Sequence, residues 1–358
     1  MSKIRILFCL LLQLYIGLAL YANTDSSGLK NNINLIEGLI ESNIDSAELL
    51  ANNLLLEYED DNFNQGIADI CRQLGNINWY KVEYNAAFKF YEKELGYRRV
   101  LEDKLGEAKC LGNIALLNYN NGNYTLAEEY FNLALNIFIT SKSKRDIALT
   151  YINLGNVAQV NNNLDQAFEY YERSNSISKK ELFHNLTLYN QINLSAILKA
   201  QRKPKKAIDY LNDALKIVEL TNDKQNEHNI YFNLGCLYNL VKDYQNALFY
   251  FKKIQHDWSN YYSKDYVEYL NNLSFSYAAI GNLYKANLLK DSVISLQDSI
   301  FKYSRYQSIN ELSTQFESKE KQQRIELLEK EKQLSETTRV IYLGSILTAI
   351  IKIGRAHV

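Results

Sequence analysis

Six side-chain amides recur along the chain at a nearly fixed interval. They are Gln73, Asn113, Asn153, Asn193, Asn233 and Asn272, separated by steps of 40, 40, 40, 40 and 39 residues. Asparagine is a mediocre helix former, so its repeated placement needs a reason. Because a carboxamide both donates and accepts hydrogen bonds, one reading is a ladder that holds the backbone of an extended peptide. The other reading is that each amide satisfies a neighbouring segment or faces water.

Residues that could carry other chemistry are scattered. The four histidines (His184, His228, His256 and His357) show no metal-ligand spacing, and neither glycine-rich phosphate-binding motif is present. We therefore expect no metal, no cofactor and no catalytic role. A net charge of −1 gives no reason to expect nucleic acid as a partner. Cys71, Cys110 and Cys236 form no C-x-x-C motif, and we interpret them as small buried hydrophobic residues.

The amides belong to a wider repeat. An alanine recurs at Ala87, Ala127, Ala167, Ala207, Ala247 and Ala286, with a weaker copy at Ala47. An aliphatic residue stands thirteen positions before each alanine of the six full copies, at Leu74, Ile114, Leu154, Leu194, Leu234 and Leu273. Apolar spacings of 3, 4 and 7 within each half indicate helices. With 1 Pro and 14 Gly in 358 residues, the chain is predicted to be all-α, built from helix hairpins that must stack to bury their apolar faces.

This pattern resembles the tetratricopeptide repeat family over about Asn31 to Gln297. The period of 40 exceeds the usual 34, so longer helices are expected, and the only proline, Pro204, lies in a turn. The resemblance implies a right-handed α-solenoid of about seven hairpins across 23–299. It also implies that the first helix of each hairpin lines a concave groove that binds a protein or an extended peptide. Further residues expected on that face are Arg72, Trp79, Tyr119, Tyr189 and Phe232.

The first 22 residues form a separate unit. Two basic residues precede an apolar run that ends at Ala22, which is the layout of a secretory signal peptide. An uncleaved anchor is the alternative. Both readings place the following region outside the cytoplasmic membrane, in the periplasm. Attachment to the inner membrane is expected through the apolar segment near the end of the chain.

Residues 300–339 change in character. Glu317–Lys321, Glu320–Arg324 and Glu326–Lys330 have the favourable i, i+4 order, while Ile309, Leu312 and Phe316 form a short apolar seam. We predict a long charged helix that pairs with a second copy as an imperfect coiled coil, giving a homodimer. The alternative is a single helix packed on the last hairpin.

The end of the chain carries two further segments. Residues 340–351 contain no charge and are predicted to begin a truncated transmembrane helix. Residues 352–358 can be encoded by a string that resembles a sequencing adapter, so we interpret them as an artefact; a genuine short basic end is the alternative.

This order of segments resembles the extracytoplasmic half of bacterial membrane receptors with tetratricopeptide sensors. The resemblance implies a binding domain that relays occupancy through the charged helix to a missing output domain, a histidine kinase or a helix-turn-helix regulator. The alternative is a membrane-tethered scaffold for envelope proteins that transmits no signal.

Overall fold

A computed structural model describes residues 26–254 and 264–356, with side chains for 28–254 and 264–339. These residues form fourteen helices and no strand, as predicted. The helices are α2 (Ser26–Ser42), α3 (Ile44–Asp60), α4 (Asn64–Tyr80), α5 (Tyr84–Val100), α6 (Lys104–Asn120), α7 (Tyr124–Thr140), α8 (Lys144–Val160), α9 (Leu164–Lys180), α10 (His184–Ala200), α11 (Pro204–Thr221), α12 (Lys224–Leu240), α13 (Tyr244–Lys253), α14 (Lys264–Ala279) and α15 (Leu283–Ala356). The chain divides into two compact units between Asp243 and Tyr244.

Short turns join the helices of the first unit, and most of its helices are 17 residues long. After α3, the Phe63 N–H donates to the Tyr58 carbonyl at 2.9 Å and the Asn62 N–H donates to the Glu59 carbonyl at 3.1 Å. This is a Schellman motif, which requires a left-handed residue. That residue recurs every 20 positions, at Asn62, Val82, Glu102, Gly122, Lys142, Asn162, Leu182, Arg202, Asn222 and Lys242. The residue that follows each of them immediately precedes the next helix, so each of these turns contains only two or three residues.

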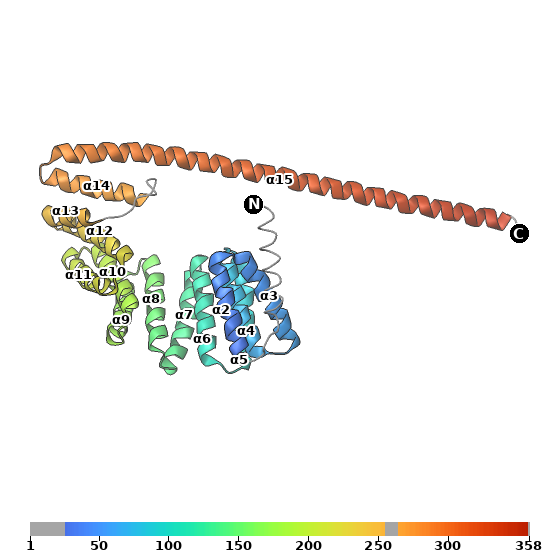
Figure 1. Cartoon of the computed structure of the whole chain (residues 1–358), viewed down its shortest axis with the longest axis horizontal. Helices are drawn as coiled ribbons and strands as arrows, with labels where there is room; N and C mark the ends of the chain where they lie inside the picture. Colours follow the sequence, from blue (N-terminus) through green and yellow to red (C-terminus); the bar gives the residue numbers. More distant parts are fainter. Residues whose placement is uncertain (1–25, 255–263, 357–358) are drawn as a thin grey trace. The chain divides into compact units, whose positions relative to one another are not determined.

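Packing follows the predicted columns. Each repeated alanine from Ala47 to Ala247 is fully buried, and so are the aliphatic residues from Leu74 to Leu234. The small residue next to the aliphatic makes room for a side chain of the second helix: a Cβ on Gly75 would lie 2.3 Å from the Tyr91 ring, and one on Gly155 would lie 2.7 Å from the Tyr171 ring. Consecutive helices of the first unit therefore pack side by side in chain order (Figure 1).

The second unit contains α13, α14 and α15. The Ser274 hydroxyl on α14 donates to the Ala286 carbonyl on α15 at 2.8 Å, and the Tyr269 hydroxyl donates to the Phe251 carbonyl on α13 at 3.3 Å. Helix α15 is 74 residues long and continues well beyond this hairpin (Figure 1), and its side chains from Phe301 to Arg339 are all exposed.

The predicted ion pairs of α15 do not form. Among the described side chains of this helix, the ion pair within 4 Å joins Lys302 to Asp298, at 3.5 Å. The residues at the three i, i+4 spacings, Glu317–Lys321, Glu320–Arg324 and Glu326–Lys330, are all exposed and form no ion pair within 4 Å. Surface pairs of this kind contribute little in any case.

Several predicted segments lie outside the described residues. The signal peptide at 1–22 is one, and for the predicted transmembrane start at 340–351 only the helical backbone is described. Within the described part of the chain, no helix is long and apolar enough to cross a bilayer.

Candidate functional site

A groove of about 290 Å³ crosses the first helices of three consecutive hairpins, α4, α6 and α8. We call it the amide groove, because Asn113 on α6 and Asn153 on α8 both line it. The full lining is Arg72, Asn76, Lys109, Gly112, Asn113, Leu116, Phe131, Phe138, Asp146, Leu149, Thr150 and Asn153. The buried rings of Phe131 and Phe138 from α7 form its floor. The groove thus has an apolar base and two amides on its walls.

The two amides are available to a ligand. Asn113 and Asn153 are half-buried, and neither side chain hydrogen-bonds another group within the part of the chain that the structure describes. A half-buried amide that lacks an internal partner is satisfied by water or by a ligand. These two residues therefore meet the first requirement of a backbone-binding ladder.

Charges at the edges of the amide groove are partly compensated. The Arg72 guanidinium lies 3.1 Å from the Asp69 carboxylate, and the Ser143 hydroxyl donates to the Asp146 carboxylate at 2.6 Å. Lys109 is exposed on the α6 face, one turn before Asn113. With few open charges, the groove suits the neutral main chain of a peptide better than a highly charged ligand.

The other predicted amides are placed differently. Gln73 is only 1% exposed, and its Nε2 donates to the Glu37 carboxylate on α2 at 3.0 Å, so α2 covers it. Asn193, Asn233 and Asn272 each donate from Nδ2 to the carbonyl four residues earlier, at 3.0, 3.0 and 2.9 Å. In these three residues the amide nitrogen is thus already bonded to the backbone of its own helix.

The further residues expected on this face also differ in their positions. Arg72 lines the amide groove, and Tyr189, 44% exposed, lines a pocket of about 460 Å³ beside α10. Trp79 instead packs edge-on against Tyr80, with ring centroids 5.0 Å apart. Tyr119 does the same with Tyr124 at 5.6 Å. The aromatic floor of the groove comes from phenylalanines of α7 and not from the first helices.

A second amide column was missed at the sequence level. Asn76 and Asn156, three residues after the predicted column, accept hydrogen bonds from the hydroxyls of Tyr91 and Tyr171, at 2.8 and 2.6 Å. The signal was present: where the second helix carries Phe131, Leu211 or Phe251 instead of tyrosine, the matching position is Leu116, Ala196 or Cys236. Tyrosine and asparagine therefore occur together, in the α4–α5 and α8–α9 hairpins.

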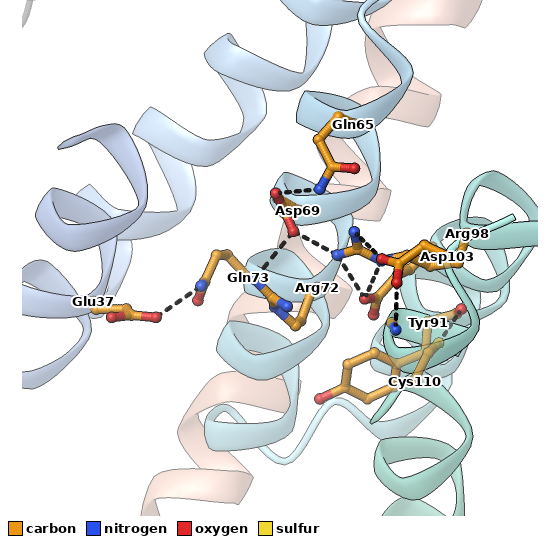
Figure 2. Close-up of polar contacts among 11 residues, drawn as sticks. Glu37, Gln65, Asp69, Arg72, Gln73, Tyr91, Arg98, Asp103 and Cys110 are labelled. Carbon is orange, nitrogen blue, oxygen red and sulfur yellow. Dashed lines mark hydrogen bonds and ion pairs between the residues drawn. The ribbon is translucent and has the colours of Figure 1, made fainter. Parts of the chain in front are cut away.

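A buried ion cluster joins α4, α5 and α6 (Figure 2). The guanidinium of Arg98, 2% exposed, contacts Asp69 at 2.5 Å, Glu94 at 3.3 Å and Asp103 at 3.2 Å. Burial raises the pKa of the Glu94 carboxyl, although the nearby Arg72 and Arg98 oppose that rise. The sequence pattern did not reveal this cluster, because its members lie up to 34 residues apart without a recurring spacing.

The interface between α9 and α10 is polar as well. Asn190 donates to the Ser174 hydroxyl at 2.8 Å, while Asn175 Oδ1, Ser178 Oγ and Asn190 Oδ1 are buried and lack a partner among the described groups. The matching residues of α7 and α11 are Ala134, Phe138, Ala214 and Val218. Interfaces between hairpins therefore alternate between polar and apolar along the first unit.

Metal and thiol chemistry find little support in the described residues. No group of three or more histidine, cysteine or acidic side chains there could hold a metal ion. Cys71, Cys110 and Cys236 are buried and form no disulfide bond among the described residues, which confirms their interpretation as small core residues. Burial raises the pKa of the Cys71 thiol to about 12, so it stays protonated and unreactive.

Comparison with known families agrees with the repeat pattern. Family models described as "Tetratricopeptide repeat" match residues 146–220, 108–138 and 228–255. No curated protein sequence matches the chain.

Solved structures share the fold at low identity. The signal transduction ATPase with a tetratricopeptide repeat sensor from Pyrococcus horikoshii has a TM-score of 0.59 and 19% identity, over 79% of this chain and 45% of its own. The apo form of RapI has a TM-score of 0.53 and 18% identity, over 76% of this chain and 99% of its own. The apo quorum sensor NprR from B. thuringiensis has a TM-score of 0.51 and 16% identity, over 75% of this chain and 87% of its own.

Proposed function

Because this chain carries tetratricopeptide repeats, we propose that its first unit is a protein-interaction solenoid that binds an extended peptide along the amide groove. The observation that carries the proposal is the pair Asn113 and Asn153, which stand across the groove on α6 and α8 without an internal hydrogen-bond partner. Each amide can donate to a peptide carbonyl and accept from a peptide N–H. This main-chain recognition is tolerant of sequence, so side-chain contacts must supply selectivity.

The groove shape supports the same proposal. Its floor is apolar at Phe131 and Phe138, which would bury ligand carbon without demanding hydrogen bonds. An open volume of about 290 Å³ fits a short stretch of main chain with one or two side chains. NprR, which shares the fold, is described as a quorum sensor, so a peptide-scale signal is a reasonable ligand class to test first.

The test uses the full chain and a displayed library of random ten-residue peptides. Peptides selected on the native chain should lose about tenfold or more in affinity for Asn113→Ala/Asn153→Ala, since two net hydrogen bonds contribute about 1–3 kcal/mol. The control is Asn132→Ala/Asn136→Ala, which removes two exposed amides from the outward face of α7. Equal affinity for all three proteins would sink the proposal.

We further propose that ligand binding is sensed and relayed through α15. This helix extends from its contact with α14 to well beyond the last hairpin, and its exposed Ile309, Leu312 and Phe316 form an apolar seam that a second copy would cover. A change in the hairpins that hold its first turns would then alter the pairing of two such helices. An extracytoplasmic location and attachment to the inner membrane are parts of this proposal that depend on residues 1–22 and 340–351.

The two uses of the solenoid differ in one measurable way. In a sensor, a selected peptide should change the distance between spin labels placed on α15 of two copies. In a scaffold for envelope proteins, peptide should bind without changing that distance. A periplasmic reporter fused after residue 339 would test the location in either case.

A further inference from the structure

A second hollow, of about 440 Å³, lies between α10 and α12 in the same unit. We call it the alanine hollow. Its lining is Ile192, Ser195, Ala196, Lys199, Ala200, Asn233, Leu237 and Leu240. It adjoins the pocket beside Tyr189, because Ile192 lines both.

Small residues create this hollow. Ala196 on α10 occupies the repeat position that holds Leu116 on α6 and Asn156 on α8. Ala200 likewise occupies the position of Asn120 and Val160. At those two positions α10 therefore presents methyl groups, where the neighbouring hairpins present larger side chains.

The third difference lies between the two alanines. Lys199 takes the place of Tyr119, whose ring packs against Tyr124. A lysine can direct its ammonium into solvent and leave only its aliphatic stem at the wall. This exchange also leaves room that an aromatic ring would fill.

The walls are apolar and incompletely covered. Leu237 is buried at the base, while Leu240 is 55% exposed at the rim, and Lys199 alone is charged among the lining residues. A half-exposed leucine beside an open apolar cavity loses dispersion contacts that a side chain of matching shape would restore.

A hydrogen-bonding group stands at the same rim. Asn233 donates through Nδ2 to the Asn229 carbonyl of its own helix. The group that remains to bind a ligand is its Oδ1, which can accept a hydrogen bond. An amide oxygen beside an apolar cavity can accept the main-chain N–H of a residue whose side chain enters that cavity.

We propose that the alanine hollow receives one large apolar side chain, aromatic or long aliphatic, of the extended peptide that the solenoid binds. This inference rests on the proposed function and names the feature that selects among peptides. The occupant is a single side chain because the hollow is about the size of one bulky residue with its flanking main chain, and because Asn233 supplies a main-chain contact at its rim. Burying such a side chain contributes roughly tenfold to a hundredfold in affinity, enough to make it the anchor of the complex.

The experiment uses the full chain, peptides selected from the ten-residue library, and two filling variants. Ala196→Leu installs the residue that α6 carries, and Ala200→Val installs the residue that α8 carries, so both substitutions already exist in neighbouring hairpins. The control is Ala279→Leu, an exposed alanine on α14. Far-ultraviolet circular dichroism with thermal melting establishes that each variant is folded.

We expect the selected peptides to share one position occupied by Phe, Tyr, Trp, Leu or Met. Affinity should fall at least tenfold in Ala196→Leu and in Ala200→Val, and stay unchanged in Ala279→Leu. Replacing the shared apolar residue of the peptide by alanine should weaken binding to the native chain and have little further effect on the filling variants.

The possible failures are distinguishable. Peptides that bind through Asn113 and Asn153 but share no apolar position, or that bind the filling variants as tightly as the native chain, overturn this inference alone. A library without any binder overturns the proposed function and this inference together.

Discussion

The hydroxyl of Tyr171 on α9 donates to the side-chain oxygen of Asn156 on α8 at 2.6 Å. It also lies 3.0 Å from Gln159 Oε1, and the Asn156 Nδ2 in turn points to the Tyr189 hydroxyl on α10 at 3.5 Å. One buried tyrosine thereby ties the two helices of its own hairpin to the next hairpin. Gly155 permits this arrangement, because a Cβ there would lie 2.7 Å from the ring.

Tyr171→Phe should lower the free energy of unfolding by about 1–2 kcal/mol, because it leaves the half-buried amide oxygen of Asn156 without its donor. The double variant Tyr171→Phe/Asn156→Leu reproduces the Phe131–Leu116 pair of the preceding hairpin and should recover most of that loss. Urea denaturation of the full chain measures both. If the double variant is as unstable as the single one, the hydrogen bond from Tyr171 to Asn156 is not the source of the stability that the tyrosine contributes.

Much of this fold follows from the periodicity of the sequence. The alanine and aliphatic columns are visible because every hairpin must bury the same two positions, and they predicted the buried alanines from Ala47 to Ala247. The turns were harder. Only Gly122 among the left-handed positions of the first unit is a glycine, so the Schellman closure is imposed by packing on residues such as Val82 and Leu182. The site was predicted in part for a similar reason: the amide column marks one helix face, but whether each amide is free depends on its neighbours, such as Glu37 above Gln73.

The Schellman closure of the turn forces Val82 into a strained backbone conformation. Its φ of 64° lies in the left-handed region, which costs a β-branched residue about 1–2 kcal/mol. Val82→Gly should therefore raise the melting temperature of the full chain, because relief of the strain exceeds the added entropy of the unfolded state. Gly122 serves as the reverse control: Gly122→Val should lower the melting temperature. Unchanged stability in both variants would show that the turn relaxes around either residue.

The buried cluster around Arg98 should be sensitive to the loss of its cation. Arg98→Met leaves Asp69 and Glu94 facing each other in a buried site, and breaking a buried pair in this way costs about 3–5 kcal/mol. Arg99→Met is the matched control, because Arg99 is 59% exposed. Its partner Glu107, at 2.9 Å, also pairs with Lys104 at 3.0 Å and so keeps a cation in the variant. Equal destabilisation of the two variants in urea denaturation would contradict the role assigned to Arg98.

Glu94 gives this cluster a defined pH dependence. Since burial raises its pKa in the folded state, the folded protein holds the proton more tightly than the unfolded chain. The contribution of Glu94 is therefore fully present below the usual pKa of a glutamate and is lost as pH rises through the raised value. Melting temperatures of the native chain and of Glu94→Gln, compared from pH 4 to pH 8, should diverge with rising pH, with the variant gaining relative stability. Parallel curves would contradict the raised pKa.

The seam on α15 predicts the oligomeric state. If a second copy covers Ile309, Leu312 and Phe316, the full chain should sediment as a dimer, and Leu312→Ser/Phe316→Ser should shift it toward monomer without changing the melting of the first unit. Leu126→Ser/Leu133→Ser removes two exposed leucines from α7 and should leave the dimer intact. A native chain that sediments as a monomer at micromolar concentration would instead favour a single exposed helix.

The polar interface between α9 and α10 should be replaceable by the residues of the next interface along the chain. Ser174→Ala/Ser178→Val/Asn190→Ile copies Ala214, Val218 and Ile230, which occupy the same positions one hairpin later. At this interface three buried atoms have no partner among the described groups, and the triple variant removes two of them, Ser178 Oγ and Asn190 Oδ1. Leaving such atoms unsatisfied costs about 1–3 kcal/mol each. Its urea midpoint should therefore rise, while the reverse exchange Ala214→Ser/Val218→Ser should lower it.

In a solenoid, where each hairpin contacts only its neighbours, these effects should be local. Hydrogen exchange should accordingly slow in α9 and α10 of the triple variant while exchange in α4 and α5 stays the same, and a triple variant less stable than the native chain would mean that ordered water already satisfies these groups.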